Sequence, residues 1–548
     1  MEENKIEIND ENKQEVSEKK PNKKVNALLV ILIVLAIVVT GSIGYVVKLM
    51  MDEDKKPAAT TKTSVEKSFV TTEYTMTGNN IEKFDLAFLK LENNGKNMVY
   101  SPLSIKYGLQ MLGEGASGNS KSQIDSILGN YKYRKYNNNS NMSFANAMFI
   151  KDSYSKKVKA EYTDNLKTKY NAEVVTDSFK NANTINKWVK NKTFNLIDSI
   201  YDDKDMDDMN FALINSLAID MDWTNAIQCA ASSTVPCKTY YNVSYNHEKY
   251  NAGILHIEDD YYPSTEFEGG IKAKSVKIGV SVNKYDIVNT LGRENIFNEI
   301  SKEYKEWLNS DNECGAKDPD YTEEDITKYV NNFIDELDKN YKRLDDSTDF
   351  YFEDTDDIKV FAKDLKEYDG STLQYVGIMP KNVSLSNYID NIDKDTIIDI
   401  ISNLKTIELD SFEEGYVTRI SGTIPLFKFD YELNLNNDLK ALGVTDIFDE
   451  DKINLSNMVA SNNIVIDTKH KANIEFSNEG IKAAATTSVG GLGNMSCGFE
   501  HLYEVPIKEI DLTFDKPYLF LVRDKNSGEV WFIGTVYTPI ENTKPARY

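Results

Sequence analysis

HKANIEFSNEGIKAAATTSV, at residues 470–489, joins two different sequence patterns at one glycine. Before Gly480, apolar and polar residues alternate strictly from Lys469 to Phe476. One face of this segment carries His470, Ala472, Ile474 and Phe476, and the other carries Lys469, Lys471, Asn473 and Glu475. A period of two predicts a half-buried strand, so Gly480 follows a strand and begins a different kind of segment.

The segment after Gly480 is almost uncharged, although it belongs to a long connection between strands. Residues 481–499, IKAAATTSVGGLGNMSCGF, contain one charge, Lys482, in a chain whose charged residues make up 27%. Strand-like sequence returns only beyond residue 506, and connections of this length inside a compact domain are usually functional or disordered. Composition alone leaves open a plain surface loop of alanine, glycine and threonine.

The same segment also fits a buried strand. With a period of two, the inward face would carry Ile481, Ala483, Ala485 and Thr487, and the outward face Lys482, Ala484, Thr486 and Ser488. The only charge then stays on the outward side, and insertion into a sheet avoids burying an unpaired charge. The pattern therefore favours a loop that can join a sheet.

Further motifs occur in order along the chain. They are NMVYSPLSI (97–105), LGEGASGNSKSQI (112–124), ANAMFI (145–150), WVKNKTFNLI (188–197), ALINSLAIDMDW (212–223), VGIMP (376–380), IPLFKF (424–429), LKALGVTDIFD (439–449), FDKPYLFLVRD (514–524) and FIGTVYTP (532–539). Together with HKANIEFSNEG, they resemble the serpin family over residues 78–542. One large domain is therefore expected, not several.

The resemblance implies an α+β fold of three β-sheets surrounded by helices, with an exposed reactive-centre loop. It implies a metastable protease inhibitor and not an enzyme, without a metal or another cofactor, and a monomer. A protease cleaves the loop, the hinge inserts into the main sheet as an extra strand, and the protease is trapped as an acyl-enzyme. The new strand gives unpaired backbone groups partners on both sides.

The resemblance also assigns roles to residues of this sequence. The hinge comprises Gly480, Ile481, Lys482, Ala483, Ala484, Ala485, Thr486 and Thr487. The shutter and breach, where the sheet opens and the loop first enters, comprise Ser101, Ser104, Asn215, Trp223 and His470. Ile481 stands where inhibitory relatives carry Thr or Ser, so slower insertion is expected. Asn195 replaces a glycine that is common in the family.

The position of the cleaved bond is predicted by counting from Gly480. The usual distance gives Asn494–Met495, and a loop one residue longer gives Met495–Ser496. Leu492 and Phe499 remain alternatives, because the connection is longer than is typical. The absence of basic residues here favours elastase- or subtilisin-like serine proteases, or a cysteine protease, over trypsin-like targets.

The N-terminal region predicts a membrane anchor. Residues 27–47 carry no charge, and a helix of that length would span roughly 32 Å against a hydrocarbon core of about 30 Å. Four lysines lie at residues 19–24, just before this stretch, and three acidic residues lie at 52–54, just after it, which predicts that the N-terminus is inside the cell. The predicted organisation is a cytoplasmic tail (1–26), a transmembrane helix (27–48), an extracellular linker (49–77), the serpin domain (78–542) and a C-terminal tail (543–548). A cleaved signal peptide is the alternative.

Charge, cysteines and insertions add further expectations. A formal net charge of -24 argues against nucleic acid as a partner. Cys229 and Cys237 are either paired or independent thiols. Insertions are expected at about 224–270 and 285–355; the second is acidic and helix-like. The composition is typical of a low-GC bacterium. A non-inhibitory serpin that acts as a surface binding or adhesion module is the alternative function, and a membrane-bound hydrolase lacks an identifiable nucleophile–base pair.

Overall fold

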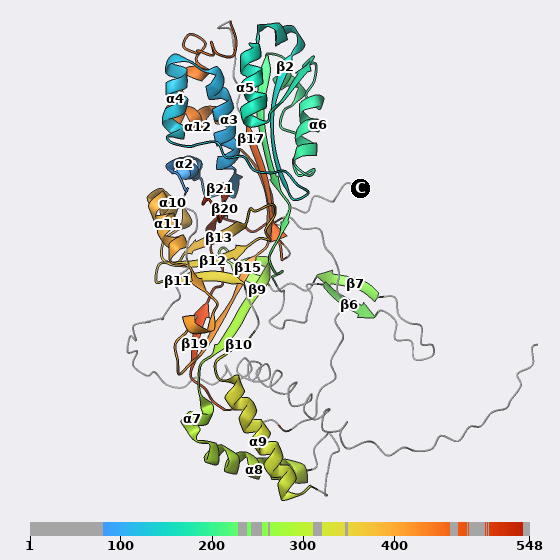
Figure 1. Cartoon of the computed structure of the whole chain (residues 1–548), viewed down its shortest axis with the longest axis vertical. Helices are drawn as coiled ribbons and strands as arrows, with labels where there is room; N and C mark the ends of the chain where they lie inside the picture. The colour runs from blue at the N-terminus through green and yellow to red at the C-terminus, as the bar shows by residue number, and fades with distance from the viewer. Residues whose placement is uncertain are drawn as a thin grey trace, which may run out of the picture. The chain divides into compact units, whose positions relative to one another are not determined.

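The computed structural model describes most of the chain beyond residue 79 (Figure 1). The described residues are 80–227, 238–242, 255–260, 264–310, 321–345, 349–433, 435–460, 469–478, 480–481, 499, 501 and 503–540. They form two compact units. The smaller unit takes its described residues from 287–338 and 491–505, and the larger unit contains the others.

A seven-stranded antiparallel sheet lies in the core of the larger unit. Its strands, in spatial order, are β1 (Met98–Tyr100), β21 (Val530–Val536), β20 (Tyr518–Asp524), β13 (Leu373–Pro380), β12 (Ile358–Asp364), β11 (Phe350–Asp354) and β14 (Lys405–Thr406). Val376 and Ile378 of β13 pack into one apolar cluster, whereas Tyr375 and Met379 pack into another. Both faces of this sheet are therefore covered, which explains the continuous apolar sequence of its strands.

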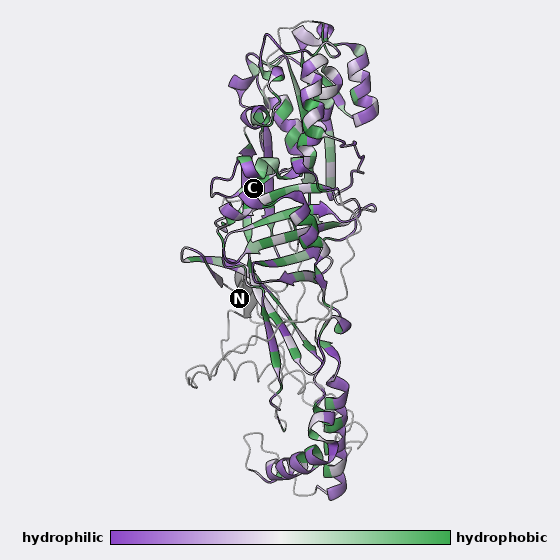
Figure 2. Cartoon of the chain, turned by 90° about the vertical axis from the view of Figure 1, so that its left-hand side faces the viewer, coloured by the Kyte–Doolittle hydropathy of each residue, from purple (hydrophilic) through white to green (hydrophobic). Residues whose placement is uncertain are grey.

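A second sheet contains the strand that follows the long connection. Its strand order is β10 (Arg343–Asp345), β9 (Ile271–Asn283), β15 (Val417–Pro425) and β19 (Ile507–Asp511), and β8 (Ser264–Phe267) also pairs with β9. The β15–β19 pair is parallel, and the other pairs are antiparallel. Hydrophobic colouring follows the strands of the larger unit in Figure 2, as expected for sheets that form a core.

The main sheet is present in two parts. One part has the order β3 (Glu173–Asp177), β2 (Met142–Lys151) and β4 (Phe211–Ile219). The other has the order β16 (Phe427–Leu433), β17 (His470–Phe476), β18 (Gly480–Ile481) and β5 (Met221–Asp222). Because β5 directly continues β4 beyond Asp220, the two parts meet along one stretch of chain.

Helices surround these sheets. In the larger unit they are α2 (Lys83–Leu91), α3 (Pro102–Gly115), α4 (Gly118–Leu128), α5 (Ala160–Tyr170), α6 (Asn183–Lys192), α10 (Leu385–Asn391), α11 (Lys394–Ser402) and α12 (Leu435–Ala441). Short 3₁₀ turns occur at Asp152–Lys157, Asp203–Met206, Leu409–Ser411 and Asp446–Phe448. The SPLS motif starts α3, because the Ser101 side chain accepts a hydrogen bond from Ser104 N and Pro102 occupies the first helical position.

The two insertions contain regular structure. In the first, β6 (Lys238–Asn242) pairs with β7 (Leu255–Asp260). In the second, the helices α7 (Ile287–Leu291), α8 (Arg293–Asn309) and α9 (Glu323–Asn340) occupy most of the expected range, and β10 and β11 beyond them are strands of the sheets described above. Cys229 and Cys237 lie outside the described residues.

The predicted membrane span at 27–48 also lies outside the described part of the chain. Among the residues that the structure describes, no helix combines the length and apolar character needed to cross a bilayer.

Candidate functional site: a slot in the main sheet

The strands β4 and β17 border a slot in the main sheet. Over the described residues, β4 pairs with β2 on one side, and β17 pairs along its whole length with β16. Between β4 and β17 only the two residues of β18 supply a bridge: Ile481 pairs with Phe476 on one side and with Met221 on the other. The rest of the slot has no strand among the described residues.

Side chains from both strands line this slot. Near the hinge, the slot is bordered by Leu217, Ala218, Ile219, Asn473, Ile474, Glu475 and Ile481, and it opens to solvent there. At its other end, the slot is bordered by residues that include Ser101, Ser104, Asn215 and His470. The segment from Thr193 to Ile197 covers the part near the hinge. Within it, Asn195 has a φ of 62°, a left-handed backbone conformation that glycine adopts without steric cost.

The first two hinge residues are already inside the sheet. Ile481 is 3% exposed and packs with Phe476 and Met221 in one apolar cluster. A side chain at Gly480 would meet the carbonyl oxygen of Met221 and would place its Cβ 2.7 Å from the Cα of Asp222. Only glycine therefore allows the chain to enter between β17 and β5 at this level.

The predicted breach residue, Trp223, lies directly beside this entry point. Its indole N–H donates to the carbonyl oxygen of Ser477 at 3.0 Å, and its ring packs edge-on against Phe476 at 5.6 Å. Ser477 in turn holds the turn before the hinge, because its Oγ donates to Gly480 O at 2.9 Å and accepts from Gly480 N at 3.2 Å. Trp223 is 1% exposed, so we expect its fluorescence emission to change if this turn opens.

The predicted shutter residues converge at the other end of the slot. Ser101 N donates to His470 Nε2 at 3.0 Å, and the Ser104 hydroxyl donates to the backbone oxygen of Asn215 at 3.4 Å. The Asn215 amide donates to Asn146 Oδ1 at 2.8 Å. Asn146 was not predicted as a site residue, although its place in the ANAMFI motif, directly opposite Asn215 on β2, is the signal that could have found it.

Polar atoms beside the slot lack hydrogen bonds. Asn215 Oδ1, Ser216 Oγ and Asn473 Oδ1 are buried and have no hydrogen-bond partner within the described part of the chain. Each such atom costs roughly 1–3 kcal/mol while it stays unpaired. Over the described residues, the sheet thus has both an unfilled strand position and polar groups that a further strand could satisfy.

The slot thus combines a strand position that is open over the described residues, a buried glycine hinge at one end and a Ser–His–Asn cluster at the other. A model of the Serpin (serine protease inhibitor) family matches residues 83–236 and 331–539, more than half of the chain. The chain belongs to the serpin family. The predicted serpin fold is thereby confirmed, with helices around mixed sheets.

Known serpins agree with this assignment. Neuroserpin of Mus musculus is 23% identical over 466 residues, which cover 81% of this chain and 86% of neuroserpin. Leukocyte elastase inhibitor of Homo sapiens is 28% identical over 204 residues, covering 37% of this chain and about half (49%) of that protein's length. The crystal structure of the thermophilic serpin tengpin in its native state gives a TM-score of 0.53 at 20% identity, over 84% of this chain and 96% of tengpin.

The rest of the predicted loop lies beyond the described residues of this serpin. Lys482 to Thr487, the alternative Leu492, and the candidate bonds at Asn494, Met495 and Ser496 all fall there. Phe499 is described, and its side chain is 5% exposed. A protease must hold the residue before the cleaved bond in its own pocket, so burial argues against Phe499 as that residue.

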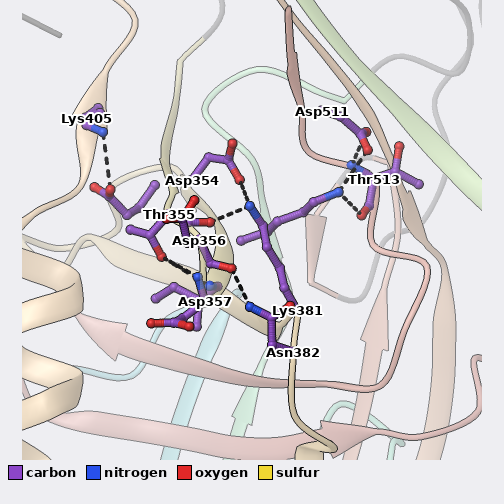
Figure 3. Close-up of polar contacts among 12 residues, drawn as sticks. Asp354, Thr355, Asp356, Asp357, Lys381, Asn382, Lys405, Asp511 and Thr513 are labelled. Atoms are coloured by element: carbon purple, nitrogen blue, oxygen red, sulfur yellow. Dashed lines mark hydrogen bonds and ion pairs between the residues drawn. The ribbon is translucent and has the colours of Figure 1, made fainter. Parts of the chain in front are cut away.

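Side-chain contacts and strand pairing hold β19, the strand that follows the loop, against neighbouring strands of the larger unit (Figure 3). Lys359 of β12 forms an ion pair with Asp511 at 2.9 Å and donates to Thr513 O at 3.3 Å. Nearby, Lys381 pairs with Asp354 at 2.5 Å. Since β19 also pairs with β15 along its length, we expect the C-terminal side of a cut loop to stay in place while the hinge side moves.

The buried histidine of the shutter, His470, should make the free energy of unfolding depend on pH. Burial lowers the pKa of His470 to about 4, against about 6.5 in an unfolded chain. The unfolded state therefore binds more protons between these values, so the stability contribution is complete above pH 6.5 and is lost as pH falls towards 4. From pH 7 to pH 5, urea unfolding of the uncut protein should show a loss of about 2 kcal/mol from this group.

The matched variant is His470→Gln, whose amide oxygen can still accept the hydrogen bond from Ser101 N. This variant should lack the loss between pH 7 and pH 5. Equal pH dependence in the variant and the wild type would show that His470 is not the titrating group.

Proposed function

We propose that this serpin inhibits proteases by a single suicide cleavage of its reactive loop, followed by insertion of the hinge into the slot between β4 and β17. One observation carries the proposal: Ile481 is already paired with both β17 and β5, and Gly480 with β5, at the end of a strand position that no other described residue occupies. These pairs form the start of the strand that insertion of the rest of the hinge would extend.

The register of the two hinge pairs extends to the rest of the hinge. Continuing the pairing of Ile481 with Phe476 and Met221, Lys482 would lie between Glu475 and Asp220, so its charge would meet two carboxylates. Cross-strand pairs of opposite charge stabilise a sheet. The one charge of the segment therefore matches the slot.

The inward positions of the hinge match the slot equally well. Ala483 would lie between Ile474 and Ile219, and Ala485 between Ala472 and Leu217. Thr487 would then come between His470 and Asn215, where the unpaired Asn215 Oδ1 lies. Small apolar residues thus meet the apolar wall, and the hydroxyl meets the polar shutter. The slot and the segment are complementary position by position.

The chemistry is supplied by the target protease. Its nucleophile attacks the carbonyl carbon of the reactive bond, the peptide nitrogen leaves as a protonated amine, and an acyl-enzyme remains on the hinge side. Water would normally release that ester. Insertion of the hinge instead moves the attached protease along the sheet before hydrolysis, and the loss of its active-site geometry keeps the ester intact.

The proposed targets are elastase- or subtilisin-like serine proteases, with cysteine proteases second. The absence of basic residues between Ala483 and Phe499 and the similarity to leukocyte elastase inhibitor support this choice. The uncharged stretch at 27–47 supports a single-pass membrane anchor with the serpin domain outside a bacterial cell. The protein acts as a monomer in this proposal, and nucleic acid has no role.

A protease panel tests the proposal. The full chain, purified in detergent, is incubated with pancreatic elastase, subtilisin, trypsin and papain, and mass spectrometry identifies the released peptide. We expect an SDS-resistant complex with elastase or subtilisin and cleavage between residues 482 and 498. Cleavage without any covalent complex across the panel, with no rise in thermal stability after the cut, would favour the non-inhibitory alternative.

A further inference from the structure

The smaller unit is built from the second insertion. The helices α8 and α9 bring together an apolar seam of Ile296, Ile300, Ile326, Val330 and Ile334, all fully buried. Within each helix these residues recur at a spacing of four, so each helix presents one apolar face to the other. Hydrophilic colouring covers much of both helices in Figure 2. The insertion therefore has a small core of its own.

An aromatic group on these helices surrounds a residue from the end of the reactive loop. Tyr304 of α8 and Tyr329 of α9 stack with ring centroids 3.8 Å apart and nearly parallel planes. Phe499 packs edge-on against Tyr304 at 5.4 Å, Trp307 at 6.2 Å and Tyr329 at 6.3 Å. We call Tyr304, Trp307 and Tyr329 the aromatic seat. It buries Phe499 almost completely, to 5% exposure.

Polar contacts continue the attachment beyond Phe499. His501 Nδ1 lies 2.7 Å from Glu303 Oε2, and His501 Nε2 lies 4.0 Å from Glu299 Oε1. The His501 ring also packs edge-on against Tyr503 at 4.5 Å. Two residues of the loop end, Phe499 and His501, are thus held by α8 through different kinds of contact.

We propose that α8 and α9 position the C-terminal flank of the reactive loop, with Phe499 as the positioning residue, and so limit protease attack to the segment before it. The proposal rests on the assignment of residues 482–498 as the loop that proteases cleave. A protease needs several residues around the cleaved bond in an extended, accessible form. Residues that are buried in the aromatic seat and paired with α8 do not offer this form.

The pairing register in the slot limits the position of the reactive bond from the N-terminal side. In the hinge pairing described above, residue 491 would lie opposite Phe211, where β4 begins. Insertion along all of β4 therefore uses the loop up to residue 491, and the attached protease must come after it. The reactive bond is then confined to residues 492–498, a range that includes Asn494–Met495 and Met495–Ser496.

Chymotrypsin tests the aromatic seat directly, because it cleaves after exposed phenylalanine. The rate of cleavage after Phe499 therefore measures how well the aromatic seat protects this residue. The full chain in detergent is digested briefly with excess enzyme, quenched in acid and mapped by mass spectrometry. We expect Tyr329→Ala to increase the rate of cleavage after Phe499 at least about tenfold over the wild type. Tyr329→Phe retains the ring and should restore protection.

A matched control and a second readout separate the possible outcomes. Phe297→Ala removes an aromatic ring of the same apolar cluster that is not part of the aromatic seat, and it should leave Phe499 protected. With a protease that the wild type traps, Phe499→Ala should raise the number of inhibitor molecules consumed per protease. Cleavage after Phe499 that is equally fast in wild type and Tyr329→Ala would overturn the seat. Failure of trapping alone would instead count against the proposed function, since the chymotrypsin map does not depend on trapping.

Discussion

Ile481→Arg should turn this inhibitor into a substrate: the protease cuts the loop, leaves, and no covalent complex accumulates. Ile481 lies between Phe476 and Met221 and is 3% exposed. An arginine there should leave this apolar cluster in the uncut protein, so insertion would have to bring the charge back into it. Burying an unpaired charge costs several kcal/mol. If about 3 kcal/mol of this cost falls on the barrier to insertion, insertion slows by a factor of more than 100. The acyl-enzyme is then hydrolysed before the hinge can insert.

The measurement is the number of serpin molecules consumed per protease molecule inactivated, read by gel and by residual protease activity. Two control variants accompany this measurement. Ile481→Val keeps an apolar side chain and should trap protease as the wild type does. Lys482→Arg places an arginine one position further on, where the proposed register would put it between Glu475 and Asp220, and this variant should also trap. Trapping by Ile481→Arg at the wild-type ratio would exclude insertion of this segment.

Gly480→Ala should expel the hinge from the sheet before any protease arrives. The added methyl group would collide with backbone atoms of Met221 and Asp222, and backbone cannot move aside as a flexible side chain can. Pairing of β18 with β5 would be lost, and so would the first step of insertion. We expect trapping to fall at least about tenfold, which corresponds to only about 1.4 kcal/mol on the insertion barrier.

Trp223 supplies an independent readout for this variant. Its indole donates to Ser477 O in the turn that leads to Gly480, so expulsion of the hinge should expose the ring and shift its emission to longer wavelength. Gly108→Ala is the matched control, because no atom lies within 4 Å of its added Cβ and it lies within α3. An unshifted emission spectrum in Gly480→Ala, together with normal trapping, would contradict the assigned role of the glycine.

The fold and much of the slot were predicted by two different routes. The alternation from His470 to Phe476 predicts β17 by itself, whereas the serpin fold was predicted from the resemblance of the ordered motifs to that family. The structure places Ser101, His470 and Asn215 around one end of the slot. The family resemblance grouped these three residues; periodicity by itself could not, since they come from distant segments.

Contacts made by the insertion could not be predicted in this way. Phe499 remained a candidate for the cleaved bond because its burial depends on Tyr304 and Tyr329, which lie in helices far away in the sequence. Helical periodicity predicts that α8 and α9 have apolar faces, but it does not say what else those faces bind. Asn146 was missed for a similar reason, because its role depends on pairing with Asn215 across two strands.

Hydrogen exchange on the cleaved protein tests the central claim most directly. The loop is cut once between residues 492 and 498, and amide exchange of β4 and β17 is compared before and after the cut. A new strand between them should pair their free edges, so the freshly bonded amides of Phe211–Ile219 and His470–Phe476 should exchange at least about 100-fold more slowly. Unchanged exchange in both strands after complete cleavage would show that the slot stays open, and the account of this serpin as an inserting inhibitor would be wrong.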